Sequence, residues 1–192
     1  GVITPATEIC DRIGLAALDN VEIEIGGQRI DKQYSRWLDI WGELTTKSGH
    51  HTGWDGLVGP AQDNAVTSYT ASVPLQFWFC RNPGLALPLI ALQYHEVKVV
   101  IQFAPNATLA AGDGKINSAK LWVDYIYLDT DERRRFAQVS HEYLIEQLQF
   151  TGDESVTSTN NKIKLNFNHP CKELVWVVQM DACVNSQAVT GA

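Results

Sequence analysis

The sequence predicts an all-β fold, an antiparallel sandwich or jelly roll with short helices inserted in its connections. About seven to nine segments alternate apolar with polar residues, or are rich in β-branched and aromatic residues, as β-strands are. Two short stretches have helical spacing instead. Because strands and helices do not alternate regularly along the chain, a parallel sheet of βαβ units is disfavoured and an antiparallel arrangement is favoured.

A hairpin followed by a helix is predicted for residues 21–45. Residues 21–25 alternate Val or Ile with Glu, which predicts a half-buried strand, and Gly26-Gly27 predicts the hairpin turn. The apolar residues that follow are spaced for one helical face: Tyr34, Trp37, Leu38, Trp41 and Leu44. Asp31 is the predicted N-cap of this helix.

The next part of the chain is predicted to hold a long loop and an edge strand. Residues 47–65 are rich in Gly and polar residues, so we expect a loop there. Residues 67–80 have the composition of a strand, but Pro74 cannot donate to a ladder, which places this strand at an edge or a bulge. Cys80 ends the apolar run and is expected to be a buried thiol. Pro88 is expected to start a short helix.

Further strands are predicted on both sides of a second helix. They occupy residues 96–103, 121–128, 143–150, 163–167 and 174–180. The strand at 121–128 is expected to be buried because it is almost wholly apolar. We expect residues 104–117 to form a loop and Thr130 to cap the helix, whose acidic residues precede its arginines as the helix dipole prefers.

Composition limits the possible functions. The chain has 192 residues and a net charge of −7, which argues against broad binding to phosphate backbones because that needs a basic surface. Its four cysteines include no C-x-x-C pair, so neither a zinc site nor a redox dithiol is expected, and a reducing compartment is favoured over a disulfide framework. The apolar runs are shorter than the ~18–20 residues that a membrane span needs.

One polar segment holds the residue types that nucleophilic catalysis uses: Ser48, His50, His51 and Asp55. Closeness in sequence does not create the geometry of a triad, and no G-x-S-x-G turn occurs, so an ordinary polar loop is favoured. The two histidines with Glu43 or Asp55 are also candidate metal ligands, although adjacent His side chains diverge. We therefore assign no catalytic, cofactor-binding or metal-binding residue and expect no cofactor.

Four other patterns have ordinary explanations. Gly112–Lys115 is similar to a phosphate loop but lacks its spacing and its Ser or Thr. Arg133–Arg135 could grip phosphates, but acidic residues precede it, so a solvated helix is favoured. The six tryptophans could form a sugar-binding face, but packing in a core or an interface is favoured. Asn106-Ala107-Thr108 matches the N-glycosylation acceptor, which makes Asn106 a candidate for modification.

Four segments match one known protein family in their order and separations. They are Val21–Asp31 (VEIEIGGQRID), Val73–Lys98 (VPLQFWFCRNPGLALPLIALQYHEVK), Val123–Phe150 (VDYIYLDTDERRRFAQVSHEYLIEQLQF) and Leu165–Gln179 (LNFNHPCKELVWVVQ). Together they resemble the major capsid proteins of large icosahedral nucleocytoplasmic DNA viruses, with chlorovirus, mimivirus and iridovirus members among the most similar. Since the resemblance covers only part of such a protein, the chain is expected to be an internal portion of a longer polypeptide.

The resemblance implies a double jelly roll. Residues 1–128 would form the larger part of the first jelly roll, 129–140 an inter-domain linker with a short helix, and 141–192 the beginning of the second. Three copies would form a capsomer with a pseudo-hexagonal outline, and capsomers would tile an icosahedral shell, contacting each other and minor capsid proteins. The viral membrane would lie beneath, without direct nucleic-acid contact. The protein would reside in the virion after assembly in the host cytoplasm, and the loops at 47–65 and 104–117 would reach the capsomer surface or a neighbouring subunit.

Two other functions are compatible with the composition. A carbohydrate-binding β-sandwich module would present its tryptophans on one exposed concave face. A metal-dependent jelly-roll enzyme would use His50 and His51, although the His-x-His pattern of such enzymes is missing. The long matching segments favour a structural virion protein that is not an enzyme.

Overall fold

The computed structural model describes residues 2–4, 11–59, 68–105 and 115–178. The chain divides into two compact units, Gly1–Leu148 (unit 1) and Gln149–Ala192 (unit 2). Each unit is described by itself.

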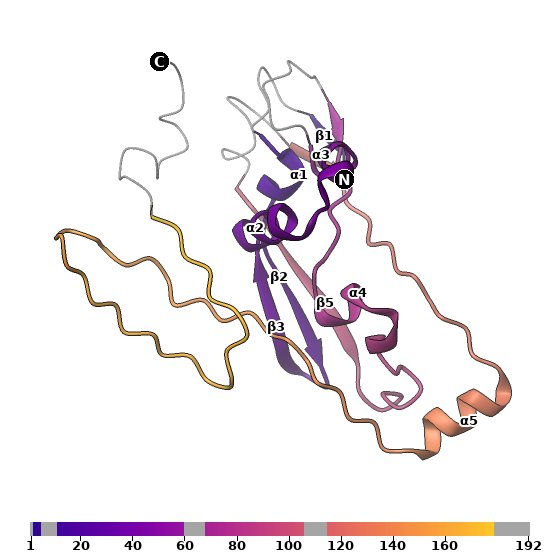
Figure 1. The fold of residues 1–192 in the computed structure, drawn as a ribbon. Coiled ribbons are helices and arrows are strands. Elements are labelled where there is room, and N and C mark those ends of the chain that lie inside the picture. The colour runs from indigo at the N-terminus through magenta and orange to yellow at the C-terminus, as the bar shows by residue number, and fades with distance from the viewer. Residues whose placement is uncertain (1, 5–10, 60–67, 106–114, 179–192) are drawn as a thin grey trace. The chain divides into compact units, whose positions relative to one another are not determined.

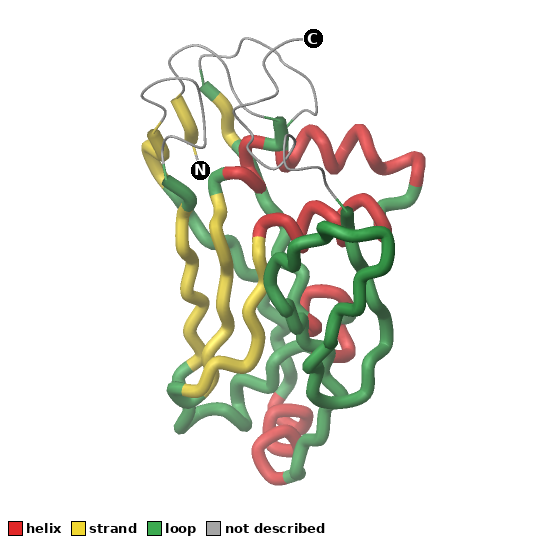
Figure 2. Tube along the Cα trace, turned by 90° about the vertical axis from the view of Figure 1, so that its left-hand side faces the viewer, coloured by secondary structure: helices red, strands yellow, loops and turns green. Residues whose placement is uncertain are grey.

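An antiparallel three-stranded sheet is the framework of unit 1 (Figure 1). Its central strand β2 (Leu18–Ile25) pairs with β3 (Gln28–Tyr34) on one edge and with β5 (Val97–Phe103) on the other, and Figure 2 shows the strands side by side. The alternation along β2 buries Val21 and Ile23 while leaving the intervening glutamates half-buried. The predicted strands at 21–25 and 96–103 are therefore confirmed.

The hairpin turn between β2 and β3 is also confirmed. Gly26 and Gly27 have φ angles of 60° and 79°, in the left-handed region that two-residue hairpin turns require. Across the same hairpin, Glu22 lies opposite Lys32, and its carboxylate is 2.7 Å from the Lys32 ammonium and 3.7 Å from the Arg29 guanidinium. Arg29 and Lys32 therefore lie with Glu22 on one face of the hairpin, whereas Asp31 is buried.

A second antiparallel sheet contains three short strands. β1 (Val2–Thr4) lies between β4 (Tyr69–Thr70) and β6 (Lys115–Ser118). The strand predicted over 67–80 is mostly wrong, because among its described residues, 68–80, only Tyr69–Thr70 is paired. β6 begins inside the segment 104–117 that was expected to be a loop and ends one residue beyond it. Of that segment, residues 106–114 lie outside the described residues.

The chain around Cys80 is helical rather than extended. α4 (Trp78–Arg81) follows an extended stretch that contains Pro74, whose nitrogen has no hydrogen to donate to a ladder. Phe77 and Trp78 enter the core at this turn and are 0% and 5% exposed. Cys80 is exposed, so the prediction of a buried thiol is wrong.

Three helices pack against the sheet: α1 (Ile13–Ala16), α2 (Ser35–Thr45) and α3 (His51–Val58). Together with the sheet and α4 they bury one main apolar cluster, which contains Leu15, Leu18, Val21, Ile23, Leu38, Trp54, Val58, Phe77 and Trp78. The predicted helix over residues 34–44 is confirmed as α2. Its cap prediction is wrong, because Tyr34 precedes the helix and Asp31 is a buried residue of β3.

The expected loop at 47–65 is partly helical. A 3₁₀ turn, η1 (Ser48–His50), leads into α3, and residues 60–67 lie outside the described part of the chain. Trp54 and Val58 are four residues apart, so they share one helical face, and both are buried in the core. This burial stabilises a helix that contains two glycines of low helix propensity, which is why composition alone predicted a loop.

A second 3₁₀ turn and one longer helix complete unit 1. Asn82 caps η2 (Pro83–Leu85), and the carbonyl of Pro88 then accepts bonds from the next amides, so the predicted helix there is a single turn. The predicted helix near 130 is confirmed as α5 (Thr130–Gln138). Its N-cap is Asp129 rather than Thr130, because the Asp129 carboxylate accepts the Glu132 N–H at 2.8 Å.

The remaining predicted strands are extended but unpaired. Within the described residues, 119–129 and 142–178 contain no helix and no ladder-forming strand, so the strands predicted at 121–128, 143–150, 163–167 and 174–178 are not present as such. Side-chain patterns predict an extended backbone, whereas a strand also needs a hydrogen-bonded neighbour. Residues 179 and 180 of the last predicted strand lie outside the described residues.

The described part of unit 2 is held by a few side-chain bonds. The Gln149 amide nitrogen donates to the Asn168 carbonyl and the Gln149 amide oxygen accepts the Asn168 N–H, both at 2.9 Å. Ser158 and Asn161 bond each other at a turn. Across both units, no described helix has the length and hydrophobicity to cross a membrane.

We predict that Gly42→Ala destabilises unit 1 although Ala is the better helix former. A methyl group at Gly42 of α2 would lie 2.7 Å from Trp54 Cε2, and such overpacking costs about 1–3 kcal/mol. Gly53→Ala in α3 is the matched control, since nothing lies within 4 Å of its added methyl and it should stabilise by about 0.5–1 kcal/mol. Denaturant unfolding measures the free energy of unfolding of both variants. Equal changes in the two variants would contradict the close packing of Gly42 against Trp54.

Candidate functional site

Among the described residues of unit 1, the extended segment between β6 and α5 carries a run of exposed apolar side chains. We name residues 121–127 the apolar arm, and Figure 1 shows it as an extended trace without a strand arrow. Trp122 and Tyr127 are 88% and 91% exposed. The other large apolar side chains of the arm are also exposed: Leu121, Val123, Tyr125 and Ile126.

Both faces of the apolar arm are suited to burial. Side chains of an extended chain alternate between two faces, and here both faces carry large apolar groups. This is the pattern of a strand covered on both sides. Contiguous exposed apolar surface of this kind marks an interaction site. The arrangement can therefore bind other protein segments through both its backbone and its side chains.

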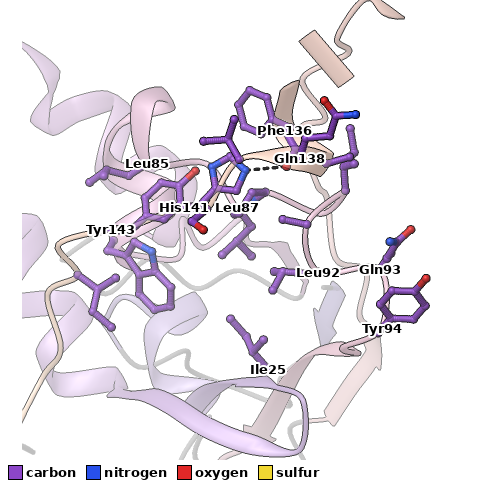
Figure 3. A pocket seen from close by; sticks show the side chains of 18 residues that line it. Ile25, Leu85, Leu87, Leu92, Gln93, Tyr94, Phe136, Gln138, His141 and Tyr143 are labelled. Carbon is purple, nitrogen blue, oxygen red and sulfur yellow. Dashed lines mark hydrogen bonds between the residues drawn. The ribbon is translucent and has the colours of Figure 1, made fainter. Parts of the chain in front are cut away.

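A hollow of about 600 Å³ lies between residues 85–94 and the end of α5 (Figure 3). Its walls are mainly apolar and include Trp78, Leu87 and Ile145. His141 lines one side, where its Nε2 is 2.8 Å from the Phe136 carbonyl oxygen and its ring stacks on Phe136 with centroids 5.0 Å apart. The segment after α5 is thus fixed to the helix that precedes it.

Residues 146–148 are tied to the sheet by polar contacts, which we name the Asp31 clasp. Asp31 Oδ1 accepts the Leu148 N–H at 3.1 Å and the Lys32 N–H at 2.9 Å. The Gln147 amide donates to the Ile30 carbonyl. Arg81 donates to the Glu146 carboxylate at 2.9 Å.

The clasp extends into the interior of unit 1. Asp31 and Gln33 are 4% and 2% exposed, and the Gln33 amide nitrogen donates to Asp31 Oδ2 at 3.2 Å and to the Gln76 carbonyl at 2.9 Å. Arg81 Nε donates to the same carbonyl at 2.9 Å, and its guanidinium lies 4.1 Å from the ring centroid of Trp41. Buried polar groups need hydrogen-bond partners, and this network supplies them for the Asp31 carboxylate and the Gln33 amide nitrogen, while the buried Gln33 amide oxygen has none.

Burial raises the pKa of Asp31 above its ordinary value. The hydrogen bonds from Leu148, Gln33 and Lys32 and the charge of Arg81 act in the opposite direction without cancelling the effect. Sequence reasoning missed this role and assigned Asp31 to a helix cap. The available indication was the outward-facing charge of Lys32, because its neighbours at 31 and 33 must then face inward.

A second charged cluster surrounds Arg12. Its guanidinium bonds the carboxylates of Asp39 and Glu43 and lies 4.0 Å from Asp55 Oδ1. Burial alone would lower the pKa of Arg12, but the two hydrogen-bonded carboxylates outweigh it and raise the pKa. The cluster joins the start of α1 to α2 and α3. Its three carboxylates are already paired with the Arg12 guanidinium.

The residues considered for catalysis or metal binding do not form one site. Ser48 and His50 are exposed on η1, and no hydrogen bond joins them to His51 or Asp55 in the described structure. Asp55 and Glu43, the candidate metal ligands, face Arg12 instead. Among the described residues no group of three His, Cys, Asp or Glu side chains could hold a metal ion.

The other candidate residues are separated in the structure. Asn106 and residues 112–114 lie outside the described residues. Arg133–Arg135 lies on exposed α5, where Arg134 is 3.7 Å from Asp131. In unit 1, Trp54 and Trp78 are buried, Trp37 and Trp41 pack on each other at 5.6 Å, and Trp122 belongs to the apolar arm. They do not form the single exposed face that sugar binding would need.

Two family models match consecutive parts of the chain. Residues 3–129 match the major capsid protein N-terminus, and residues 132–190 match the large eukaryotic DNA virus major capsid protein. The boundary between the two matches falls at the start of α5.

Individual relatives agree with the family models. The chain is 62% identical over 172 residues to a major capsid protein of Pyramimonas orientalis virus, covering 85% of this chain and 43% of that protein. It is 45% identical over 172 residues to the major capsid protein of Paramecium bursaria Chlorella virus 1, covering 83% and 39%. The chain thus spans less than half the length of these relatives.

A solved structure has a similar fold. A quasi-atomic model of the PBCV-1 virus capsid superposes with a TM-score of 0.74 at 40% identity, covering 88% of this chain and 45% of that chain. A crystal structure of PBCV-1 VP54, fitted into a reconstruction of the virophage Sputnik, gives 0.67 at the same identity, covering 78% and 39%. The jelly-roll fold predicted from the sequence is confirmed by these structures.

We predict that Asp31→Asn changes how stability depends on pH. Because the pKa of Asp31 is raised in the folded state, the folded chain binds this proton more tightly than the unfolded chain does. The stabilisation by Asp31 is therefore full below its unfolded pKa and is lost as the pH rises through the raised, folded value. Relative to the variant, the wild type should lose stability in urea unfolding as the pH rises from below the ordinary pKa of an aspartate through the raised pKa of the folded state. If the free energies of unfolding of the wild type and of Asp31→Asn changed in parallel with pH, the prediction would be contradicted.

Proposed function

The chain belongs to the major capsid protein family of large eukaryotic DNA viruses, and we propose that it is part of a structural subunit of the virion shell. The observation that carries this proposal is the match of both family models over nearly the whole chain. The extensive apolar surface of the arm supports it, because shell subunits need area for contacts rather than a catalytic pocket.

We also propose a domain organisation. Residues 1–128 form the larger part of a first jelly roll, 129–140 a linker with a short helix, and 141–192 the beginning of a second jelly roll. Support comes from α5 (Thr130–Gln138), which occupies the linker, and from the change of family model between residues 129 and 132. The segments after α5 would then gain their strand partners from the rest of the second jelly roll.

The complete protein is proposed to assemble with copies of itself. Three copies would form a pseudo-hexagonal capsomer, and capsomers would contact one another and minor capsid proteins in an icosahedral shell over the viral membrane. No catalysis and no direct binding of nucleic acid are part of this role. The net charge of −7 supports the second point, because phosphate contacts need basic surface. Assembly would take place in the host cytoplasm.

Negative-stain electron microscopy and native mass spectrometry of the complete protein test this function. Threefold particles with a pseudo-hexagonal outline and the mass of three subunits are expected, and these should tile into sheets or shells. Monomers that never associate at any concentration would refute the proposal.

We predict that Trp122→Glu prevents assembly of the complete protein. If the apolar arm becomes a covered strand, the new carboxylate must be buried without a partner, which costs several kcal/mol and should lower the trimer yield by about tenfold or more. Gln28→Glu introduces the same side chain at an exposed position at the start of β3, outside the segments expected to reach a neighbouring subunit, and should leave assembly intact. Native mass spectrometry of both variants distinguishes these outcomes, and equal trimer yields would contradict burial of the arm.

A further inference from the structure

We propose that Asp31 is a positioning residue that fixes the register in which the chain crosses the edge of β3 on its way out of unit 1. The inference goes beyond the proposed capsid function and does not depend on it, because every contact lies within unit 1. Leu148, whose N–H donates to Asp31, is the last residue of that unit.

The first step concerns the free edge of β3. β3 pairs with β2 on one edge, and in the described residues no strand ladder forms on the other. Residues 147 and 148 instead reach this region through side chains: the Gln147 amide donates to the Ile30 carbonyl, and the Leu148 N–H donates to Asp31 Oδ1 at 3.1 Å. The Gln147 side chain therefore satisfies the Ile30 carbonyl, which a neighbouring strand could otherwise satisfy, and the Leu148 backbone supplies a donor to the buried Asp31 carboxylate.

The second step concerns three consecutive residues that are held by different parts of unit 1. Glu146 is held by Arg81 of α4, Gln147 by the backbone of Ile30, and Leu148 by the side chain of Asp31. Ile145, just before them, packs against the main apolar cluster. One apolar contact and three directional polar contacts thus act on four successive residues.

The third step distinguishes a contact that only stabilises the exiting segment from one that fixes its register. An apolar contact such as that of Ile145 tolerates sliding, whereas a slip of one residue in an extended segment turns every side chain to the opposite face. Hydrogen bonds are directional, so the bonds to Asp31 and Ile30 permit one register only. A buried carboxylate is costly, and an apolar side chain at position 31 would pack at lower cost, which is why we assign Asp31 a role in specificity.

Amide hydrogen exchange on the complete protein tests the proposal. In Asp31→Ala we expect the Leu148 amide to exchange about tenfold or more faster, as for loss of one bond to a charged acceptor, while amides in the centre of β2 keep their protection. Asp31→Asn should stay close to the wild type at Leu148, because its amide oxygen can still accept that N–H. Glu96→Ala, an exposed acid beside β5, is the control and should change neither region.

Two results would overturn the inference. Unchanged exchange at Leu148 in Asp31→Ala would show that the bond does not hold the segment. A uniform increase across β2 and Leu148 would show that Asp31 serves only the stability of the fold.

A second variant covers the case in which Asp31→Ala does not fold. Gln147→Ala removes the bond to the Ile30 carbonyl from an exposed side chain, so folding of unit 1 should persist. Faster exchange confined to residues 146–148 would support the clasp, whereas unchanged exchange there would overturn it. If the complete protein failed to form trimers, the hydrogen-exchange results could still be interpreted, because Asp31, Ile30 and residues 146–148 all belong to the same subunit.

Discussion

Backbone pairing is the constraint on which this structure depends. β2 has hydrogen-bonded neighbours on both edges, and its alternating side chains then bury Val21 and Ile23 beneath α2 and α3. Where pairing is absent from the described residues, as in the apolar arm, equally apolar side chains remain exposed. The arm contains one charged residue, whereas β2 contains Asp19, Asn20 and two glutamates, so the arm is exposed for lack of a neighbouring strand and not for lack of apolar side chains. Local hydrophobic pattern therefore sets the tendency of a segment to be buried, and pairing decides whether burial occurs.

The distinction between local hydrophobic pattern and pairing with a distant strand also explains which elements could be predicted from the sequence. The hairpin around Gly26-Gly27, the helix with Trp37 and Trp41, and β5 follow from local spacing, and all three are present. α3 was missed because its glycines suggest a loop, while its stability comes from Trp54 and Val58 packing against distant residues. The strands predicted after residue 120 failed for the opposite reason, since their local pattern is correct and their partners are non-local. The Asp31 clasp was missed because Asp31 was assigned to a helix cap and because its partners at 146–148 are distant in sequence.

Charged side chains of unit 1 connect its structural elements through ion pairs and hydrogen bonds. Arg12 joins three helices through carboxylates that would otherwise be candidate metal ligands, and Arg81 joins α4 to Glu146 while lying over Trp41. Reactive residue types are thus present in the sequence, but the fold places them in ion pairs and hydrogen bonds rather than around a common centre. This use of charge suits a subunit whose role is to hold a shape, and it explains why motif searches in the sequence give no convincing active site.

Edge strands must avoid pairing with other molecules, and β3 shows one solution. Instead of a complete ladder, the exiting chain contributes single bonds at Ile30 and Asp31, with the Arg81–Glu146 pair beside them. A complete ladder would make residues 145–148 a fourth strand of the sheet and would determine their direction beyond the edge. Single bonds instead fix the register of residues 147 and 148 without adding a strand to the sheet. Directional polar contacts at an otherwise apolar boundary can therefore set the register of the last residues of unit 1 without extending the sheet.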